Sequence, residues 1–484
     1  PRYKPMALLR PAASFDSLSQ RYGTKYKWMV LFILGLGTVA GVLCASSFNV
    51  AVPALTRHFG LGQDQVQWAM TGFLVATTVG MLPTSWLLDR LGFRRVFLMA
   101  LLTLIIASVA GFYAPTFTLV VVARIVQGAA TGVLQPMGTL ALMRLFPPQF
   151  QGRASGILIF SIALTPAVAP SFGGILLDRF GWESIFLLGI PFAMVAGLAA
   201  IFLLPFPREI KIRPFDWLGL AWLSLGTIAL VEGVSSLQHS GPFSVWTIGQ
   251  CLVAVAAALI YYRHANRLNE PIINLNVFAR RTFAMGTVVS FSYGFGLYAS
   301  TYLIPVFLQN ALSYSAGAAG IALVPSGIAL VVMLPLAGRL ADHYAPKWLT
   351  LVGLVMFGAS FLVFSFQGGD IQYGEIIAAT VVGRIGLGMI LPALSLAALR
   401  NLEAHQLGQS TVVFSYARQL GGVMGVAIIA VFMEWRESVH GVIPPGIYTA
   451  YSQGFWLLSA VFLIAILAAF LMKIEQTPLN DARP

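Results

Sequence analysis

The chain has 484 residues, of which 58% are hydrophobic and only 10% are charged. Because an ordinary soluble domain carries about a quarter charged residues, this composition excludes a soluble enzyme. The formal net charge of +12 would indicate nucleic-acid binding only if the basic residues gathered on one folded face. They stand instead in short clusters between apolar runs, so we expect no nucleic-acid partner.

Apolar runs long enough to cross a membrane follow one another along almost the whole chain. About 20 consecutive, mostly apolar residues are needed to span a bilayer, and fourteen such runs can be distinguished. They predict an all-α integral membrane protein with 14 transmembrane helices. The expected spans are residues 28–52, 66–88, 96–114, 117–142, 154–176, 184–206, 216–237, 243–262, 283–307, 316–338, 349–368, 374–399, 410–434 and 450–472.

The basic residues are distributed very unevenly between the loops. If both termini are cytoplasmic, most of the 29 Lys and Arg residues lie in the N-terminal tail and in the loops that follow even-numbered spans. Only Arg57, Arg179 and Arg436 fall in the opposite loops. Because cytoplasmic loops are enriched in Lys and Arg, we predict a multi-pass protein of the inner (plasma) membrane with both termini cytoplasmic.

Nothing in the sequence indicates a reaction chemistry. Cys44 and Cys251 both lie within apolar runs, which favours buried thiols over a disulfide or a metal site. The six His residues fall in loops or at span ends, and no His, Asp or Ser cluster stands at one membrane depth. We therefore expect no catalytic residues, no metal, no cofactor and no enzyme activity.

Three matched pairs of positions indicate an internal repeat. Asp89 is matched by Asp342 at an offset of 253 residues, and the other two pairs have offsets of 260 and 256: Arg124 with Arg384, and Gly152 with Gly408. Such a repeat is typical of transporters built from two parallel halves. The predicted organisation is a cytoplasmic tail (1–27), a six-helix half (28–206), two additional helices with their loops (207–282), a second six-helix half (283–472) and a cytoplasmic tail (473–484).

Several motifs within this repeat carry a family resemblance. The motifs are residues 87–95 after span 2, 124–128 in span 4, 169–174 in span 5, 303–320 around spans 9 and 10, and 418–422 in span 13. Over residues 28–472 the chain resembles a major facilitator superfamily transporter of the fourteen-helix EmrB/QacA-type drug:proton antiporter group. The resemblance implies a major facilitator fold with two pseudo-symmetric halves in a 6 + 2 + 6 arrangement.

The resemblance also implies a latch at the cytoplasmic ends of the helices. A carboxylate there would pair with neighbouring arginines or cap a helix N-terminus, and so hold the halves in one access state. The alternative is a set of solvated loop charges that only help to set the topology. The residues concerned are Asp89, Arg90, Gly92, Arg94, Arg95 and Asp342.

Three arginines, Arg124, Arg384 and Arg418, lie within predicted spans, where an unpaired cation is costly. Each must therefore face the protein interior and have a partner. Arg124 would either tune a nearby proton site or meet an anionic substrate, or it would only bond to backbone carbonyl groups. For Arg418 we favour packing near the small residues Gly421 and Gly422.

Other positions are predicted to shape a cavity. The antiporter-like motif of span 5 contains Pro166, Pro170, Gly173 and Gly174, which would bend the span and allow close packing. Candidate lining residues from several spans are Cys44, Asn49, Gln127, Phe291, Tyr293 and Tyr298. The aromatic residues of span 9 could equally face lipid.

Cys44 stands where antiporters of the resembled group usually carry Asp in helix 1. A thiol with a pKa of ~8.5 is a poor counter-ion for a cationic drug. We therefore predict an alternating-access exporter, proton-coupled by resemblance, that prefers hydrophobic anionic or neutral molecules. Its expected partners are membrane lipids, a small hydrophobic substrate, protons and, by analogy alone, a periplasmic adaptor protein. An importer or lipid-moving relative, or a non-transporting receptor, are the alternatives.

Overall fold

The computed structural model describes residues 18, 20, 23, 25–205, 214–241, 244–400 and 402–472. All regular secondary structure in these ranges is helical. The elements are α2 (Lys25–Phe59), α3 (Gln63–Gly80), α4 (Thr84–Leu91), α5 (Phe93–Phe112), α6 (Phe117–Leu145), α7 (Pro148–Phe180), η1 (Trp182–Leu187), α8 (Ile190–Leu203), α9 (Trp217–Ser240), α10 (Val245–Ala265), η2 (Leu275–Ala279), α11 (Arg281–Val306), η3 (Phe307–Ala311), α12 (Ala316–His343), α13 (Pro346–Gln367), η4 (Gly368–Asp370), α14 (Tyr373–Leu399), α15 (Ala404–His440) and α16 (Gly446–Leu471).

Most of these helices are candidate membrane spans. Within the described ranges, 12 helices are long and apolar enough to cross a membrane, and α3 with α4 form a further candidate as a pair bent by 53°. The bend falls beside Pro83, which has no N–H to continue the helical hydrogen bonds. Every predicted span overlaps a helix or a helix pair, and the all-α membrane class is confirmed.

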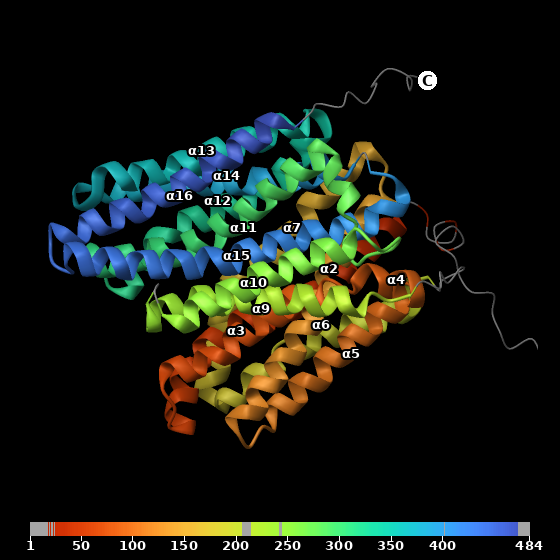
Figure 1. Cartoon of the computed structure of the whole chain (residues 1–484), viewed down its shortest axis with the longest axis horizontal. Helices are drawn as coiled ribbons and strands as arrows, with labels where there is room; N and C mark the ends of the chain where they lie inside the picture. Colours follow the sequence, from red (N-terminus) through yellow and green to blue (C-terminus); the bar gives the residue numbers. More distant parts are fainter. Residues whose placement is uncertain are drawn as a thin grey trace, which may run out of the picture.

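The helices form two bundles with a helix pair beside them (Figure 1). In the N-terminal bundle α2 packs against α6, α7 and α8, and α3 packs against α6. In the C-terminal bundle α11 packs against α15 and α16, and α12 and α13 pack against α14. The helices α9 and α10 pack against each other, and α9 also contacts α3 and α15. The additional helix pair therefore touches both bundles.

Both described ends of the chain lie at the same end of the molecule, on the right in Figure 1. We call this the basic end, because the arginines that follow α4 lie there. The predicted tails (1–27 and 473–484) lie almost entirely outside the described residues, apart from Leu18, Gln20, Gly23 and the start of α2. Three loop cations, Arg208, Lys211 and Arg213, also lie outside the described residues.

The two bundles meet most closely where α7 crosses α12 near the basic end. A Cβ atom on Gly152 would lie 2.3 Å from the Gly338 carbonyl oxygen, and one on Gly338 would lie 2.4 Å from the Gly152 carbonyl oxygen. A Cβ atom on Gly156 would lie 2.6 Å from the Leu334 carbonyl oxygen. The absence of side chains on these glycines lets the two backbones touch, so the basic end is closed.

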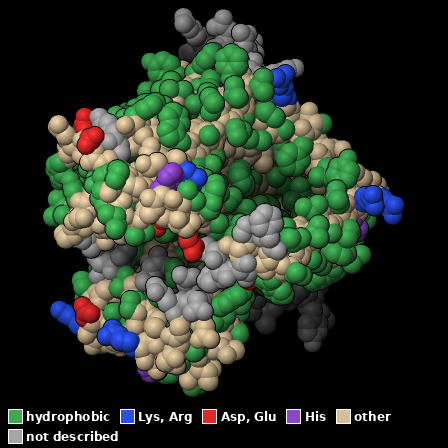
Figure 2. All heavy atoms as spheres, turned by 60° about the vertical axis from the view of Figure 1, so that its left-hand side comes forward, with side chains coloured by type: hydrophobic (Ala, Val, Ile, Leu, Met, Phe, Trp, Pro, Cys, Tyr) green, Lys and Arg blue, Asp and Glu red, His purple; other side chains and the backbone are tan. Residues whose placement is uncertain are grey.

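The opposite end of the molecule has a different shape. Figure 2 views this end and shows a hollow between the lobes, with hydrophobic side chains prominent around it. Among the described residues, the hydrogen bonds between the two bundles lie near the basic end or at the middle of the spans. The two bundles are thus closed on each other at the basic end and leave a hollow at the other (Figure 2).

Candidate functional site

The strongest polar contact between the bundles is made by Asp342, at the end of α12. Its carboxylate oxygens accept hydrogen bonds from the backbone N–H groups of Gly152 at 2.6 Å and Arg153 at 2.9 Å, near the start of α7. A helix N-terminus carries a partial positive charge, which favours a carboxylate at this place. The structure therefore brings this predicted latch residue of one bundle onto a helix start of the other.

Arg400, which follows α14, reinforces the same contact from the C-terminal bundle. Its Nη2 donates to the Pro148 carbonyl oxygen at 2.9 Å, and its Nε donates to the Gln151 Oε1 at 3.3 Å. The Gln151 amide in turn donates to the Phe146 carbonyl oxygen at 3.1 Å. Arg400 thus holds the start of α7 directly and, through Gln151, the Phe146 carbonyl group that follows α6.

The region around Asp89 in the N-terminal bundle corresponds, by the repeat, to the region around Asp342, but its described contacts differ. Asp89, on α4, lies within electrostatic reach of Arg144 at the end of α6. Gly408, in the second turn of α15, packs against Ser85, whose Oγ would lie 2.8 Å from an added Cβ. Arg90 lies over the Trp86 ring at 5.1 Å from the centroid. The pairing of Gly152 with Gly408 in the repeat therefore marks two equivalent contacts between the bundles.

The remaining residues of the predicted latch motif lie where α4 turns into α5. Gly92 has a φ of +79°, which residues with a side chain rarely adopt, so a glycine is required at this turn. Arg94 is half-buried and Arg95 is exposed in the first turn of α5. Gly92, Arg94 and Arg95 therefore lie at the closed end, and their described contacts assign a particular role only to Gly92, at the turn.

Arg124 lies in the interior of the N-terminal bundle and is only 2% exposed. Its Nη1 donates to the Cys44 carbonyl oxygen at 2.8 Å, and its Nε donates to the Ala69 carbonyl oxygen at 3.4 Å. The rings of Phe48 and Phe73 flank the guanidinium, each with its centroid 4.2 Å from Cζ. Of the two roles that the sequence left open, the structure shows the bond to backbone carbonyl groups.

Cys44 and Gln127 belong to the same interior cluster, and the prediction that they line a cavity is wrong. Gln127 is 0% exposed and donates to the Ser108 Oγ at 2.8 Å, while its Oε1 accepts from Arg124 at 3.2 Å. The Cys44 thiol is buried against Gly189, where an added Cβ would lie 2.5 Å from the sulfur. Polar residues were expected to face a cavity, but they satisfy one another inside the bundle. The side chain of Asn49 lies outside the described residues.

Replacing Arg124 with lysine should destabilise the protein, because the guanidinium makes several hydrogen bonds between two aromatic faces and an ammonium cannot repeat this geometry. We expect a loss of about 2–4 kcal/mol in the free energy of unfolding. Thermal unfolding in detergent measures it. Arg57→Lys, at an exposed position, serves as the control. Equal stability of the two variants would contradict the structural role assigned to Arg124.

The antiporter-like motif of span 5 lies in the C-terminal half of α7. The helix runs without a break from Pro148 to Phe180, although it contains the motif's prolines. Gly173 lies close to α2, since an added Cβ would be 3.2 Å from the Ser47 Cβ, whereas Gly174 faces open space. Pro166 is exposed, and the side chain of Pro170 lies outside the described residues. One of the two glycines therefore serves close packing.

A cationic group lies at the middle of the C-terminal bundle. Arg384 on α14 and Arg418 on α15 both lie near the phenol of Tyr293 on α11. The Arg384 Nη2 donates to the Thr301 Oγ1 at 3.4 Å, and the Arg418 Nη2 donates to the Gln135 Oε1 at 3.4 Å. Within the described residues neither arginine has a carboxylate partner. The two guanidinium groups thus concentrate positive charge among neutral polar partners.

Aromatic residues of α11 surround this cationic group unevenly. Tyr293 is buried, with 4% of its surface exposed, whereas Phe291 and Tyr298 are partly exposed. Phe291 and Tyr298 also cover α15, because added Cβ atoms on Gly421 and Gly422 would strike them at 2.1 and 2.6 Å. Arg418 therefore lies near the small residues Gly421 and Gly422, and its side chain also contacts Gln135 of the other bundle.

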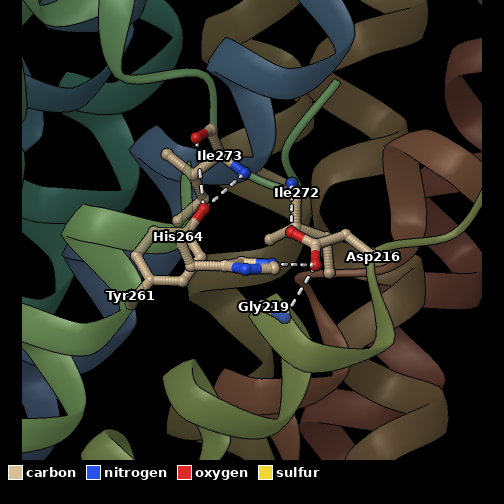
Figure 3. A network of polar contacts seen from close by, with 6 residues as sticks. All are labelled: Asp216, Gly219, Tyr261, His264, Ile272 and Ile273. Atoms are coloured by element: carbon tan, nitrogen blue, oxygen red, sulfur yellow. Dashed lines mark hydrogen bonds and ion pairs between the residues drawn. The ribbon is translucent and has the colours of Figure 1, made fainter. Parts of the chain in front are cut away.

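The helix pair α9–α10 is anchored at the basic end by Asp216 (Figure 3). The Asp216 carboxyl accepts hydrogen bonds from Gly219 N at 2.7 Å, His264 Nε2 at 2.7 Å and Ile272 N at 3.2 Å. The Tyr261 hydroxyl exchanges two further hydrogen bonds with the backbone of Ile273. One carboxyl group thus joins the start of α9, the end of α10 and the segment that follows.

The anchored segment contacts both bundles. The Phe215 ring lies 4.6 Å from the Trp86 ring of α4, and the Pro271 carbonyl oxygen accepts from Gln409 of α15 at 3.2 Å. Within the membrane, the hydroxyl oxygens of Thr227 on α9 and Tyr416 on α15 are 2.6 Å apart. The two additional helices therefore bridge the bundles on the side away from the α7–α12 contact.

Replacing Asp216 with alanine should loosen this bridge, because three hydrogen bonds are lost and the first turn of α9 loses its cap. We expect hydrogen exchange of the amides in residues 272–274 to become at least about tenfold faster, as follows from a loss of about 1.4 kcal/mol or more. Exchange measured by mass spectrometry tests this. Asp178→Ala, at an exposed position, should leave the exchange unchanged, and equal exchange in both variants would contradict the account.

Two bundles of membrane-spanning helices that close on each other at one end and leave a hollow at the other have the architecture of an alternating-access transporter. The model of the Major Facilitator Superfamily matches residues 34–425 and 286–484. The chain belongs to the Major Facilitator Superfamily, and it is a multi-pass membrane transporter and not an enzyme.

Relatives and solved structures agree with this assignment. The multidrug resistance protein B homolog of Mycobacterium tuberculosis (strain CDC 1551 / Oshkosh) is 28% identical over 439 residues, which cover 88% of this chain and 81% of the relative. The fatty acid resistance protein FarB of Neisseria gonorrhoeae is 28% identical over 423 residues, covering 86% and 83%. The proton:xylose symporter XylE has a similar fold, with a TM-score of 0.65 at 14% identity over 91% of this chain and 95% of that one.

Several residues of the site were missed by the sequence analysis. Arg400 follows Arg144 at the repeat offset of 256 residues that also relates Gly152 to Gly408, so a systematic comparison of the halves would have found it. Gln135 carries no such signal, because its importance depends on which side chain the other bundle places opposite it. Asp216 was visible only as a polar residue at a span end.

Proposed function

We propose that this protein is a secondary active exporter of hydrophobic small molecules, and that it prefers anionic or neutral molecules to cationic ones. The observation that supports this preference is the cationic group of Arg384 and Arg418, which has no carboxylate partner among the described residues. Unneutralised cations at mid-membrane disfavour a cationic substrate and favour an anion. The related proteins named for multidrug and fatty acid resistance support export of apolar molecules.

We further propose the fourteen-span, 6 + 2 + 6 arrangement of the EmrB/QacA-type group. The twelve candidate spans and the α3–α4 pair leave α7, a helix of 33 residues that packs along α2 and α12, as the fourteenth. The distribution of Lys and Arg supports an inner-membrane protein with both termini, and hence the basic end, in the cytoplasm. Asp342 and Asp89 then hold the cytoplasmic end closed.

Coupling to protons, and a periplasmic adaptor as partner, are proposed from the family resemblance. Cys44 does not supply a carboxylate in α2, so any proton-carrying group lies elsewhere in the chain. The contacts of Arg124 support a structural part for that residue in the coupling machinery rather than direct contact with the substrate.

Transport into proteoliposomes of purified protein tests the proposal. The probes are an anilinonaphthalene sulfonate, its uncharged analogue phenylnaphthylamine and the lipophilic cation tetraphenylphosphonium. We expect transport of the first two, driven by an imposed pH gradient. Transport of the cation alone would overturn the substrate preference, and transport that ignores the pH gradient would remove proton coupling.

A second candidate, a lipid-moving transporter, is favoured by one observation. A cavity of about 260 Å³ lies between α2 and α7 and is lined by Trp28, Phe32, Val39 and other apolar side chains, with Ser161 as its polar member. An acyl chain fits such a surface. Movement of fluorescent phospholipid between leaflets, without transport of the sulfonate, would favour this candidate.

A further inference from the structure

The hydrogen bond between Gln135 and Arg418 joins the two bundles part-way along two candidate membrane spans. Gln135 lies on α6 of the N-terminal bundle, about ten residues before that helix ends, and Arg418 lies on α15 of the C-terminal bundle. The Arg418 Nη2 donates to the Gln135 Oε1 at 3.4 Å. This distance is at the long limit for a hydrogen bond, so the contact is weak.

The backbone around Arg418 is fixed much more firmly than its side-chain bond suggests. A Cβ atom on Gly294 of α11 would lie 1.9 Å from the Arg418 carbonyl oxygen, and one on Gly421 would lie 2.1 Å from the Phe291 carbonyl oxygen. The helices α11 and α15 are thus in backbone contact at Arg418 and one turn beyond it. The contact sets the rotation of α15, so the Arg418 guanidinium is held toward α6.

Among the residues that the structure describes, the charge on Arg418 has no compensating anion. Arg384 adds a second positive charge near the same Tyr293 phenol, and its own bond, to the Thr301 hydroxyl, is also to a neutral group. Within the described residues no carboxylate pairs with either guanidinium. A guanidinium binds an anion through the attraction of opposite charges and often through two parallel hydrogen bonds, and a neutral amide oxygen supplies neither. An incoming anion would therefore displace the Gln135 amide.

We propose that Gln135 is the specificity-determining residue of the transport site: its amide occupies the anion position on Arg418 in the empty carrier, and the anionic head group of an amphiphilic substrate replaces it. This inference rests on the proposed export of hydrophobic anions and names the residue that selects them. A neutral substrate binds beside the pair without breaking it.

The same exchange links substrate binding to the movement of the bundles. The Gln135–Arg418 bond crosses between bundles that must change their relative position in alternating access. An anion on Arg418 breaks this bond, whereas an uncharged analogue leaves it in place. An anion therefore weakens the contact between the two bundles at this position, whereas a neutral molecule does not.

Substitutions of Gln135 test the proposal with the matched probes, the anilinonaphthalene sulfonate and uncharged phenylnaphthylamine. Gln135→Glu places a permanent anion on Arg418, and we expect the KM for the sulfonate to rise by about tenfold or more. Gln135→Ala removes the competing amide, and we expect that KM to fall by about two- to threefold. The KM for phenylnaphthylamine should change by less than about twofold in both variants.

Gln309→Glu introduces the same charge at an exposed position of η3 and is the control for net charge; we expect it to behave as the unmodified protein. Equal sulfonate KM values for the unmodified protein and Gln135→Glu would overturn the inference. A parallel loss of both probes in Gln135→Glu and Gln135→Ala would also overturn it, because it would assign Gln135 a merely structural role. If the unmodified protein transports neither probe, the proposed function itself fails, which is a distinguishable result.

Discussion

Replacing Gly338 with alanine is expected to prevent complete closure of the basic end. The added Cβ would lie 2.4 Å from the Gly152 carbonyl oxygen and 2.9 Å from the Gly156 Cα, both backbone atoms that cannot rotate away. Overpacking of this kind costs about 1–3 kcal/mol. Because 1.4 kcal/mol corresponds to a tenfold change in an equilibrium, the population of the closed state relative to the open state should fall by about fivefold or more.

Labelling of cysteines near the basic end measures this shift. With Cys251 replaced by serine, a cysteine introduced at Ser85, which packs against Gly408 across the bundles, should react faster with a membrane-impermeant maleimide in the Gly338→Ala background. Gly327→Ala is a matched control on the same helix, since an added Cβ there meets no atom within 4 Å. Equal labelling rates in the two backgrounds would show that the α7–α12 contact does not close this end.

Replacing Asp342 with asparagine is expected to slow transport by about tenfold or more. The substitution removes the charge that two backbone N–H groups of α7 contact and turns an N–H group of the new amide toward one of them. Hydrogen bonds to charged groups contribute about 1.5–3 kcal/mol, so the closed state becomes less stable and the cycle spends less time in it.

The initial rate of sulfonate transport into proteoliposomes measures this effect. Asp370→Asn removes the same charge at an exposed position between α13 and α14 and should transport at the unmodified rate. A full rate for Asp342→Asn would reduce the Asp342 contact to a local helix cap without a part in the cycle.

The fold was predictable because a bilayer imposes a strict length and composition on its helices. Each of the predicted spans overlaps a helix or a helix pair, and the repeat offsets paired Asp342 with Asp89 and Gly152 with Gly408. The helix ends were less predictable: α7 begins at Pro148 and α15 extends from Ala404 to His440. Polar residues continue these helices beyond the apolar stretch, so hydropathy alone underestimates their length.

The site was predicted less completely, since it depends on contacts between distant segments. Arg124 could be recognised as a buried cation that needs a partner, but not as one flanked by Phe48 and Phe73 from two other helices. Gln127 was misplaced for the same reason, because its partner Ser108 lies on α5. Gln135 was not identified at all, as only the packing of α6 beside α15 gives it significance.

Cys44 illustrates how a local departure from a family pattern gains meaning from structure. At the sequence level it was notable as a missing carboxylate. In the structure its carbonyl oxygen, which any residue would provide, accepts the hydrogen bond from Arg124, while its thiol fills space beside Gly189. The hydrogen bond from Arg124 to residue 44 therefore does not depend on a carboxylate side chain at that position.

The central claim is that substrate anions drive alternation between the closed and open forms of the basic end. Pulsed electron paramagnetic resonance measures it most directly, on two pairs of spin labels in a Cys251→Ser background. One pair, Arg153→Cys with His343→Cys, spans the bundles at the basic end; the other, Tyr113→Cys with Tyr373→Cys, spans them at the opposite end, and all four positions are exposed.

With saturating anilinonaphthalene sulfonate, we expect a second population of molecules. In it the two labels at the basic end lie farther apart, and the two labels at the opposite end lie closer together. Phenylnaphthylamine should produce much less of it. Distances that stay unchanged with the sulfonate, or that both increase or both decrease, would contradict the account.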